Sequence, residues 1–576
     1  MPRLSRSPVA VLAAAARLAA VLATLTAALA PLRIAAVAAV LVPLRLAAVL
    51  ATLTAPLGIL GAAGACGATA SPSSNTPSSI TQPGRAPRLV VLLVIDQWPE
   101  WSFEAKRPAL TRGFARLLRE GTWHIGQHPS AATITAVGHA LFGSGAPPSR
   151  SGILANEWWH RDVERSIKAV EAEDGTMTAQ WLRVPGLGDA IAAANTGGKA
   201  VGVSLKERSA ILPLGHTGTA IWYDHKQIAW ASLGAPAWLA AWNTAHPIAA
   251  HIHDIWTPLP ETPALAGIPD DAPGEMGGDK GFGPTFPHAL DRTPDAADAI
   301  VATPLGNELV FDIATAAIQH EQLGTDDRAD LLTISLSSHD YIGHAWGQES
   351  WESWDAALRT DRRLATFLAH LDTKVGPGRW AMAVTSDHGA SPMPETLHGG
   401  RISYPQILEA ANRAAIAELG PGTWIASVKY PTLYLSKAAL AQKPKDLTIA
   451  ITKIVYALRS FPGLARVERT ADFWGNCETR PADAQPLCLA LDPDRSGEVL
   501  FLPAPGWVFH DGNGIATSHG SLHPYDRLVP LILLPPGRSP HAPQTAPLST
   551  LPLTDVAALL STWLGIPPPS SLPPIR

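Results

Sequence analysis

Continuous apolar runs bounded by polar residues recur along most of the chain. The first, "RLVVLLVIDQW" at 88–98, is typical of a strand buried on both faces of a sheet. Similar runs predict further strands at 199–205, 330–338, 380–386 and 529–537. Apolar positions with helical spacing predict helices at 109–121, 306–324, 353–376 and 554–566. This alternation predicts an α/β fold with a doubly wound, mostly parallel central sheet.

Three segments depart from the alternation. Residues 209–300 are rich in Pro, Gly and Trp, and 404–515 mix strand and helix patterns, so we interpret both as smaller α+β insertions beside one core. Residues 67–87, "GATASPSSNTPSSITQPGRAP", form a Ser/Thr/Pro linker that cannot bury a core. The expected catalytic domain therefore spans 88–570.

The first 66 residues form an Ala/Leu-rich leader with an internal repeat. "RLAAVLATLTA" occurs at 17–27 and again at 45–55, and interspersed arginines make it a poor polytopic membrane segment. The end of the leader, "GILGAAGAC", resembles a secretory signal, and one interpretation is a bacterial lipoprotein signal with Cys66 as the lipidated residue. Ala63 departs from the leucine usual at its position, and a retained membrane anchor or a wrongly chosen start are alternatives. We expect export to the periplasm or outer envelope, with anchoring through the leader or Cys66 left open.

Composition narrows the classes of partner and fold. The chain has 44 Lys+Arg against 49 Asp+Glu, a formal charge of −5, which gives no electrostatic case for a nucleic-acid partner. Three cysteines exclude a disulfide-dense scaffold and a cysteine-rich zinc fold. Cys477 and Cys488 could still close a single disulfide in an oxidising compartment.

Acidic and imidazole residues follow three of the predicted strands: Asp96 the first, Asp340 and His344 the second, and Asp387 and His388 the third. Ligands of an open α/β sheet bind beyond the carboxyl ends of its strands, so these residues predict a metal site. The D-x-x-x-H spacing lets two ligands point the same way if the chain takes a helical turn there.

A later histidine is needed to complete two metal sites. "ATSHGSLHPYD" offers His519 and His523. Any one of these residues alone would more commonly be a strand-end cap or a turn residue, whereas the set favours metal. "HIHD" at 251–254 has metal-like spacing, but we interpret it as a loop or surface feature.

Eight motifs in order resemble the alkaline phosphatase superfamily, and within it the phosphate-irrepressible, PafA-type phosphomonoesterases. The motifs are "VIDQ", "TITAVGH", "SGILANEWW", "VGVSLKERSAILPLGH", "TPLGNELV", "SSHDYIGHAWG", "SDHGA" and "SHGSLHPYDRLVPLILL". The resemblance runs from about 88 to 570 and implies a central sheet of alkaline phosphatase type.

The resemblance implies two Zn²⁺ ions per chain. One is held by Asp340, His344 and His519, and the other by Asp96, Asp387, His388 and the oxygen of the nucleophile, Thr135. Two zinc ions roughly 4 Å apart can hold the attacking and leaving oxygens of an in-line displacement.

Thr135 matches the nucleophile of the family and lies where a helix is predicted to begin. The amide end of a helix favours a phosphoryl group, although Thr135 on its own would commonly be a plain N-cap. Thr133 also carries a hydroxyl. His139 lies one helical turn on, and we interpret it as structural because activation by metal leaves a general base no task.

Three further residues match positions that contact the phosphate. The resemblance implies that Asn156 hydrogen-bonds a nonbridging oxygen and that Lys206 and Arg208 contact the phosphate on another side. In an extended stretch, side chains at i and i+2 share one side, so both cations could reach one ligand. A cation pair suits a monoester dianion better than a diester, which carries one charge less.

The expected function is that of an exported, zinc-dependent alkaline phosphatase that hydrolyses small phosphate monoesters through a phospho-threonine intermediate. A phosphodiesterase or nucleotide pyrophosphatase on the same core is the nearer alternative. A noncatalytic zinc- or phosphate-binding envelope lipoprotein is the alternative from another class. No cysteine lies in a C-x-P-x-R context, so sulfatase chemistry is not indicated.

Overall fold

The computed structural model describes residues 86–510 and 514–574. The leader, with Cys66, and nearly all of the expected linker lie outside the described residues. Within the described ranges, no helix combines the length and the apolar character needed to cross a membrane.

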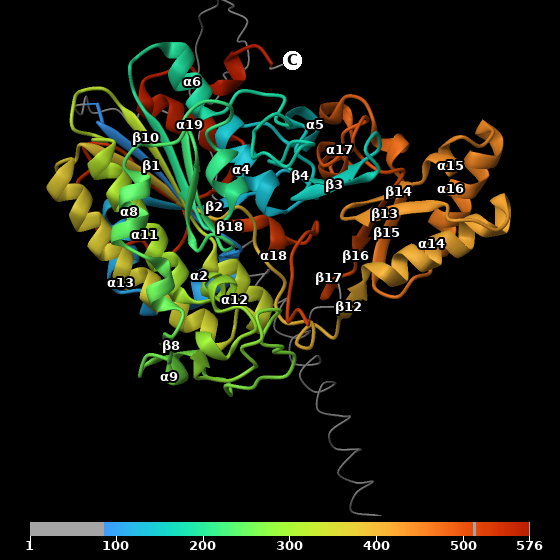
Figure 1. The fold of residues 1–576 in the computed structure, drawn as a ribbon, viewed down its shortest axis with the longest axis horizontal. Coiled ribbons are helices and arrows are strands. Elements are labelled where there is room, and N and C mark those ends of the chain that lie inside the picture. The colour runs from blue at the N-terminus through green and yellow to red at the C-terminus, as the bar shows by residue number, and fades with distance from the viewer. Residues whose placement is uncertain (1–85, 511–513, 575–576) are drawn as a thin grey trace, which may run out of the picture. The chain divides into compact units, whose positions relative to one another are not determined.

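A nine-stranded sheet forms the centre of the molecule, in the order β19-β2-β18-β11-β1-β10-β5-β6-β7 (Figure 1). Strands β11, β1, β10, β5 and β6 run parallel, whereas β18 and β7 are antiparallel to their neighbours. The bounds are β1 Leu89–Ile95, β2 Thr122–Gln127, β5 Ala200–Ser204, β6 Thr219–Asp224, β7 Ala229–Leu233, β10 Asp330–Leu336, β11 Trp380–Thr385, β18 Leu528–Leu534 and β19 Thr550–Pro552. The predicted mostly parallel α/β fold is confirmed.

Helices cover both faces of the sheet. Alternate residues of its central strands therefore pack into two different cores. Leu89, Val91 and Leu93 of β1 pack into one core, whereas Val90 and Leu92 pack into the other. The first core contains residues of α2 (Glu100–Lys106), α3 (Gly113–Glu120), α11 (Pro304–His320) and α13 (Trp351–Lys374). The second contains residues of α4 (Thr135–Ser144), α6 (Leu187–Ala194), α7 (Glu207–Ile211) and α19 (Asp555–Leu564). Burial on both faces explains why β1 is apolar throughout.

The stretch 209–300 begins as part of the sheet, since β6 and β7 extend one of its edges. Beyond β7 the chain forms short elements: α8 Leu239–Ala245, β8 Ile255–Trp256, α9 Thr262–Ala266, β9 His288–Ala289 and α10 Ala296–Ala299. The proposed insertion boundaries stay a prediction, since β6 and β7 within this stretch belong to the central sheet.

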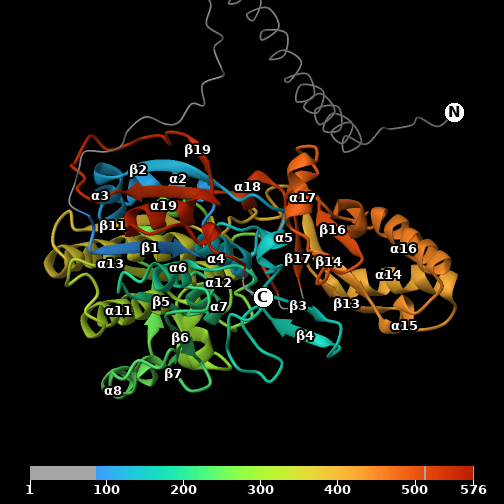
Figure 2. The same cartoon turned by 90° about the horizontal axis from the view of Figure 1, so that it is seen from above.

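A smaller lobe is built from the chain between β11 and β18 (orange in Figures 1 and 2). Its four-stranded sheet, in the order β13-β14-β16-β15, has a hydrophobic core of its own. Its elements are β12 Gly400–Ser403, α14 Tyr404–Leu419, β13 Ile425–Lys429, β14 Thr432–Leu435, α15 Lys437–Leu440, α16 Pro444–Arg459, β15 Leu464–Arg469, α17 Gln485–Leu489, β16 Val499–Pro503 and β17 Trp507–His510. Ala131 and Ile134, just before α4, also pack into this core, so the lobe touches the segment that leads to Thr135.

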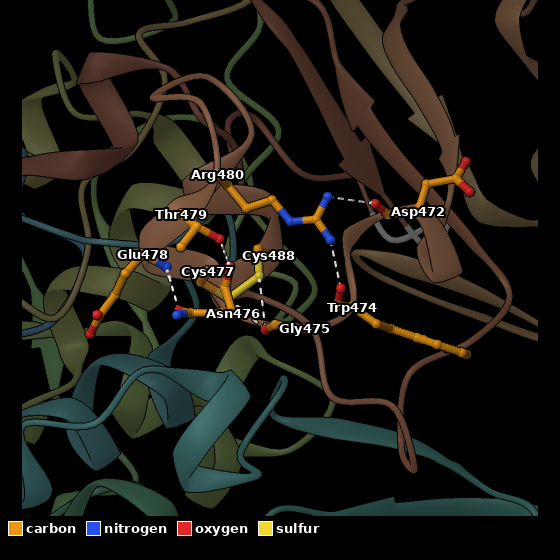
Figure 3. The surroundings of a disulfide bond; sticks show 9 residues. All are labelled: Asp472, Trp474, Gly475, Asn476, Cys477, Glu478, Thr479, Arg480 and Cys488. Atoms are coloured by element: carbon orange, nitrogen blue, oxygen red, sulfur yellow. Dashed lines mark hydrogen bonds between the residues drawn. A yellow bond between two sulfur atoms is a disulfide. The ribbon is translucent and has the colours of Figure 1, made fainter.

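A disulfide joins Cys477 to Cys488 in this lobe (Figure 3). It ties α17 to the preceding turn. The carbonyl oxygen of Pro486 in α17 accepts a hydrogen bond of 3.0 Å from the amide of Ala131. The cross-link therefore supports the same segment that leads into α4.

Candidate active site

Buried acidic side chains gather at the carboxyl edge of the central sheet. Asp96 directly follows β1, and Asp387 and His388 follow β11, which pairs with β1. Asp340 lies in α12 (Ser338–Trp346), which begins two residues after β10 ends. All four residues are buried. Because β1 lies between β10 and β11, the residues that follow the three strands meet at one place.

Three histidines, His344, His388 and His519, direct Nε2 towards these carboxylates. In each ring Nδ1 donates to a backbone carbonyl oxygen: of Thr517 at 2.9 Å, Gly389 at 3.0 Å and Thr133 at 2.7 Å, respectively. A neutral imidazole that donates from Nδ1 keeps the lone pair of Nε2 for a metal. Burial lowers the pKa of His388 and His519, which favours this neutral form.

The first group of candidate ligands comprises Asp96, Asp387 and His388. Nε2 of His388 lies 3.6 Å from Oδ1 of Asp96 and 3.6 Å from Oδ2 of Asp387. Oδ1 of Asp96 is buried without a hydrogen-bond partner. Burial and the carboxylate of Asp387 raise the pKa of Asp96 well above its ordinary value. Two buried carboxylates beside a neutral imidazole fit a divalent cation, which would offset their charge.

The second group is centred on Asp340. Oδ1 of Asp340 lies 3.2 Å from Nε2 of His344 and 3.7 Å from Nε2 of His519. The helical turn predicted from the D-x-x-x-H spacing is α12, which presents Asp340 and His344 together.

His388 lies close to both groups of candidate ligands, and the assignment of each ligand to one metal stays a prediction. Two sets of ligand atoms lie within 4.8 Å of one another: those of Asp96, Asp387 and His388, and those of Asp340, His388 and His519. His344 belongs to neither set. The rings of His388 and His519 stack with their centroids 3.7 Å apart. His388 therefore stands between the two groups.

Thr135 is the first residue of α4, as predicted. Its Oγ1 lies 3.4 Å from Nε2 of His388, so the hydroxyl adjoins the candidate ligands. The amide of Ala136 donates to Oδ1 of Asn156 at 2.9 Å, which places Asn156 beside the first turn of α4. A Cβ at Gly138 would lie 2.5 Å from the carbonyl oxygen of Asp387. A glycine therefore allows the helix to approach the ligand loop this closely.

The other hydroxyl and imidazole near Thr135 are engaged in structural contacts. Oγ1 of Thr133 donates to the carbonyl oxygen of Ser521 at 3.3 Å. Nδ1 of His139 donates to the carbonyl oxygen of Thr135 at 2.8 Å and lies 3.3 Å from Oδ2 of Asp387. Nε2 of His139 accepts from Oγ of Ser335 at 2.9 Å. His139 thus joins the start of α4 to the sheet.

Lys206 lies within the acidic cluster. Its Nζ donates to Oδ2 of Asp96 at 2.7 Å and to Oδ2 of Asp340 at 2.6 Å. Burial alone would raise the pKa of Asp340, but the Lys206 ammonium and the nearby His344 hold it well below its ordinary value. The cation therefore joins the two groups of candidate ligands.

The expected extended stretch from Lys206 to Arg208 is not observed. Lys206 has extended backbone angles, but α7 begins at the next residue, so Arg208 is already helical. Connections between a strand and the next helix are short in a doubly wound sheet. Because β5 ends at Ser204, the helix begins before an extended stretch can reach Arg208. Nε of Arg208 is buried without a hydrogen-bond partner.

A family model described as type I phosphodiesterase / nucleotide pyrophosphatase matches residues 90–526. The matched range includes the carboxyl ends of β1, β10 and β11, where the acidic residues lie, and it includes His519. The chain belongs to this family.

Proteins similar to this chain include several alkaline phosphatases. The chain is 29% identical over 518 residues to "Alkaline phosphatase PafA" of Elizabethkingia meningoseptica, covering 84% of this chain and 92% of that protein. It is 28% identical to "Alkaline phosphatase PhoV" of Synechococcus elongatus, covering 86% and 93% of the two chains. The crystal structure of wild-type PafA superposes with a TM-score of 0.74 at 28% identity, over 84% of this chain and 96% of that one. The resemblance inferred from the eight motifs is confirmed.

Two residues at the site were not assigned a role from the sequence. Gln97 follows Asp96 with a positive φ of 62°, and its Nε2 donates to Oδ1 of Asp340 at 2.8 Å. The ring centroid of Tyr341 lies 4.9 Å from Nζ of Lys206. Both residues belong to the motifs quoted above. Each contacts a residue that is far away in the sequence, and the spacing of motifs does not predict such a contact.

Two other histidine-bearing candidates lie apart from the site. Nε2 of His523 contacts the carbonyl oxygen of Pro503 at 3.1 Å instead of a carboxylate. His251 of "HIHD" pairs with Asp254 at 2.9 Å, and both side chains are exposed. The interpretation of "HIHD" as a surface feature is confirmed.

Proposed function

We propose that this chain is an exported, zinc-dependent alkaline phosphatase that hydrolyses phosphate monoesters with Thr135 as the nucleophile. The observation that carries the proposal is the position of Oγ1 of Thr135 at the start of α4, 3.4 Å from an imidazole that stands between two groups of candidate ligands. Relatives named alkaline phosphatase support the same class of reaction, since the similarity extends over most of their length.

The donor set suits two zinc ions, since each group mixes carboxylate with imidazole. Asp96, Asp387 and His388 would hold one ion, and Asp340, His344 and His519 the other. When bound, the two ions supply Lewis acidity that polarises a phosphoryl oxygen and lowers the pKa of a neighbouring hydroxyl.

The chain's own residues then define the reaction. The hydroxyl of Thr135 loses its proton to solvent as its oxygen forms a bond to phosphorus, the ester P–O bond breaks, and the departing alcohol oxygen gains a proton from solvent. The amide end of α4 faces the phosphoryl group, and Asn156 beside it offers a hydrogen-bonding amide. Water then cleaves the threonine phosphate, which releases inorganic phosphate and restores the hydroxyl.

Export is supported by the Cys477–Cys488 disulfide, because disulfides persist in oxidising compartments. The leader and Cys66 lie outside the described residues, so lipidation stays a prediction. Loss of membrane retention in a Cys66→Ala variant would support it, and unchanged retention would contradict it.

Phosphodiester hydrolysis is the second candidate, which the description of the family model favours. A cation pair beside the phosphate favours a dianionic monoester over a diester. The deciding experiment measures kcat/KM on a monoester and a diester with the same leaving group, with zinc content determined on the same sample. We expect a preference for the monoester, and we expect chelation to abolish the activity and added zinc to restore it. A diester preference, or full activity without metal, would overturn the proposal.

Arg208 offers a cleaner probe of this preference than Lys206, because Lys206 also neutralises Asp96 and Asp340. An Arg208→Ala change should remove about 1.5–3 kcal/mol of monoester transition-state stabilisation, roughly one to two decades in kcat/KM. Diester hydrolysis should fall far less, and the exposed Arg328→Ala serves as the control. Equal losses on both substrates would show that Arg208 positions the site in general.

A further inference from the structure

A buried lysine lies in the layer formed by α2 and α13, outside the candidate active site. Lys106, the last residue of α2, is 1% exposed. Its Nζ donates to three neutral acceptors: Oγ of Ser102 at 2.7 Å, the carbonyl oxygen of Gln348 at 2.5 Å and Oγ of Ser353 at 3.1 Å. Burial lowers the pKa of Lys106 to about 7, although the carboxylate of Glu349 opposes this shift. A buried amine with neutral hydrogen-bond partners costs stability, which is typical of a functional position.

Lys106 supports Gln348 at both its main chain and its side chain. Gln348 lies in the connection between α12 and α13 and is fully buried. Its carbonyl oxygen accepts from Nζ of Lys106 directly. Its Oε1 accepts at 3.4 Å from the hydroxyl of Ser353, which itself accepts from Lys106. Loss of the lysine would therefore take a donor from a buried carbonyl oxygen and loosen the serine beside it.

The side chain of Gln348 leads from this lysine to the candidate metal ligands. Its Nε2 donates to Oε1 of Gln97 at 3.0 Å and to the carbonyl oxygen of Gln97 at 2.9 Å. Gln97 contacts both ligand groups, since its Nε2 donates to Oδ1 of Asp340 at 2.8 Å and its backbone amide to Oδ1 of Asp387 at 3.2 Å. A continuous series of hydrogen bonds therefore runs from Lys106 to one carboxylate of each group.

The backbone around the two glutamines is shaped to let them meet. A Cβ at Gly343 in α12 would lie 2.1 Å from Oε1 of Gln97 and 2.5 Å from Nε2 of Gln348. Any larger side chain there would displace the two amides. Gln97 has a positive φ of 62°, which a residue with a side chain adopts only when its surroundings hold it there. The contact between the glutamines is therefore a built feature of the fold.

We propose that Lys106 is a positioning residue for the metal site. It acts through Gln348 and Gln97, which fix the carboxylates of both ligand groups. The proposal rests on the proposed function, because it presupposes zinc at these carboxylates. Partners of metal ligands orient the ligand atoms before the ion binds, so this lysine raises zinc affinity without touching the ion.

The test measures zinc affinity of the full chain by competition with a coloured chelator. It compares wild type, Lys106→Met, Gln97→Leu and the double variant, since methionine is similar in length to lysine and has no donor. We expect Lys106→Met to weaken zinc binding about 10-fold. In the Gln97→Leu background the same change should add almost nothing, because the route to the ligands is already interrupted. Lys199→Met is the control, since the exposed Lys199 also donates to a carbonyl oxygen, that of Glu321.

Each outcome decides a separate point. Absence of zinc binding by the wild-type chain would overturn the proposed function and this inference together. Unchanged zinc affinity in Lys106→Met would overturn the inference alone, and so would equal losses with and without Gln97, because the lysine would then act by another route. If Lys106→Met fails to fold, Ser353→Ala, which removes the bond from Lys106 to Gln348 through the serine, takes its place in the same cycle. Additive losses in Ser353→Ala and Gln97→Leu would contradict the proposal, and non-additive losses would support it.

Discussion

At the scale of single residues, the site is organised by how each ring and amide is oriented. Three imidazoles donate from Nδ1 to backbone carbonyl oxygens, which turns every Nε2 towards the carboxylates. Gln97 plays a similar part for a carboxylate, since its amide donates to Asp340 and its own oxygen accepts from Gln348 at 3.0 Å. These contacts fix the positions of ligand atoms before a metal binds.

The first residue-scale prediction concerns the hydroxyl. Thr135→Ala should lose most of the turnover while the chain still folds and binds zinc, because only the attacking oxygen and one methyl group are removed. Thr135→Ser should keep substantial activity, since the oxygen is retained. Turnover and zinc content measured together check this, with Thr133→Ala as the control. An inactive Thr133→Ala beside a normal Thr135→Ala would assign the reaction to the other hydroxyl.

The second concerns Gln97. Gln97→Leu keeps a side chain of similar size but removes the donor to Oδ1 of Asp340, so zinc affinity should fall about 10- to 100-fold. Competition with a coloured chelator measures the affinity directly, without relying on activity. Gln180→Leu, at an exposed position, is the control. Unchanged affinity in Gln97→Leu would show that the amide has no part in holding Asp340.

At the scale of elements, the segment before α4 connects the central sheet to the smaller lobe. Ala131 hydrogen-bonds α17, and residues on both sides of Thr133 pack into the lobe's core. The lobe therefore does more than extend the chain, because it supports the helix start that carries Thr135.

The element-scale prediction concerns the disulfide beside α17. Cys477 and Cys488 are separated by 11 positions, and opening a loop of this size should cost about 3 kcal/mol of stability. Denaturation with and without a thiol reductant checks the effect on the wild-type chain. The Cys477→Ser/Cys488→Ser variant should match the reduced wild type and show no further response to reductant. Identical curves for oxidised and reduced wild type would contradict this.

At the scale of the whole molecule, stability depends on the protonation of buried ionisable groups. Glu352 of α13 is fully buried and contacts Nε2 of His288 at 2.9 Å. Burial raises the pKa of Glu352 to about 9 and lowers that of His288 to about 4, so both are neutral at pH 7.

This neutral pair predicts a dependence of stability on pH. The ordinary pKa of Glu352 is 4.5, so the folded state binds its proton more tightly than the unfolded state does. The stabilisation is complete below pH 4.5 and is lost as the pH rises towards about 9. Glu352→Gln, which cannot ionise, should therefore lose less stability over that interval. Thermal midpoints measured from pH 5 to 9 check this, with the exposed Glu308→Gln as the control, and parallel profiles for wild type and Glu352→Gln would contradict it.

Much of the fold could be predicted from local pattern. The run at 88–98 became β1 and that at 380–386 became β11, because burial on both faces demands continuous apolar residues whatever the partner strands are. The order of Asp96, Asp340, Asp387 and His519 along the chain could also be read from the sequence alone, and it matched the order of the motifs in the family. That match predicted that the four residues belong to one site.

The tertiary structure alone decided how those residues meet. Lys206 bonds Asp96 and Asp340, which lie 110 and 134 positions away, and Gln97 bonds Asp340 across 243 positions. His388 stacks on His519 across 131 positions, which brings it close to both groups of candidate ligands. Local sequence determines which groups are available and which elements carry them. Contacts between distant segments depend on the packing of the completed layers, and no pattern of spacing encodes that packing.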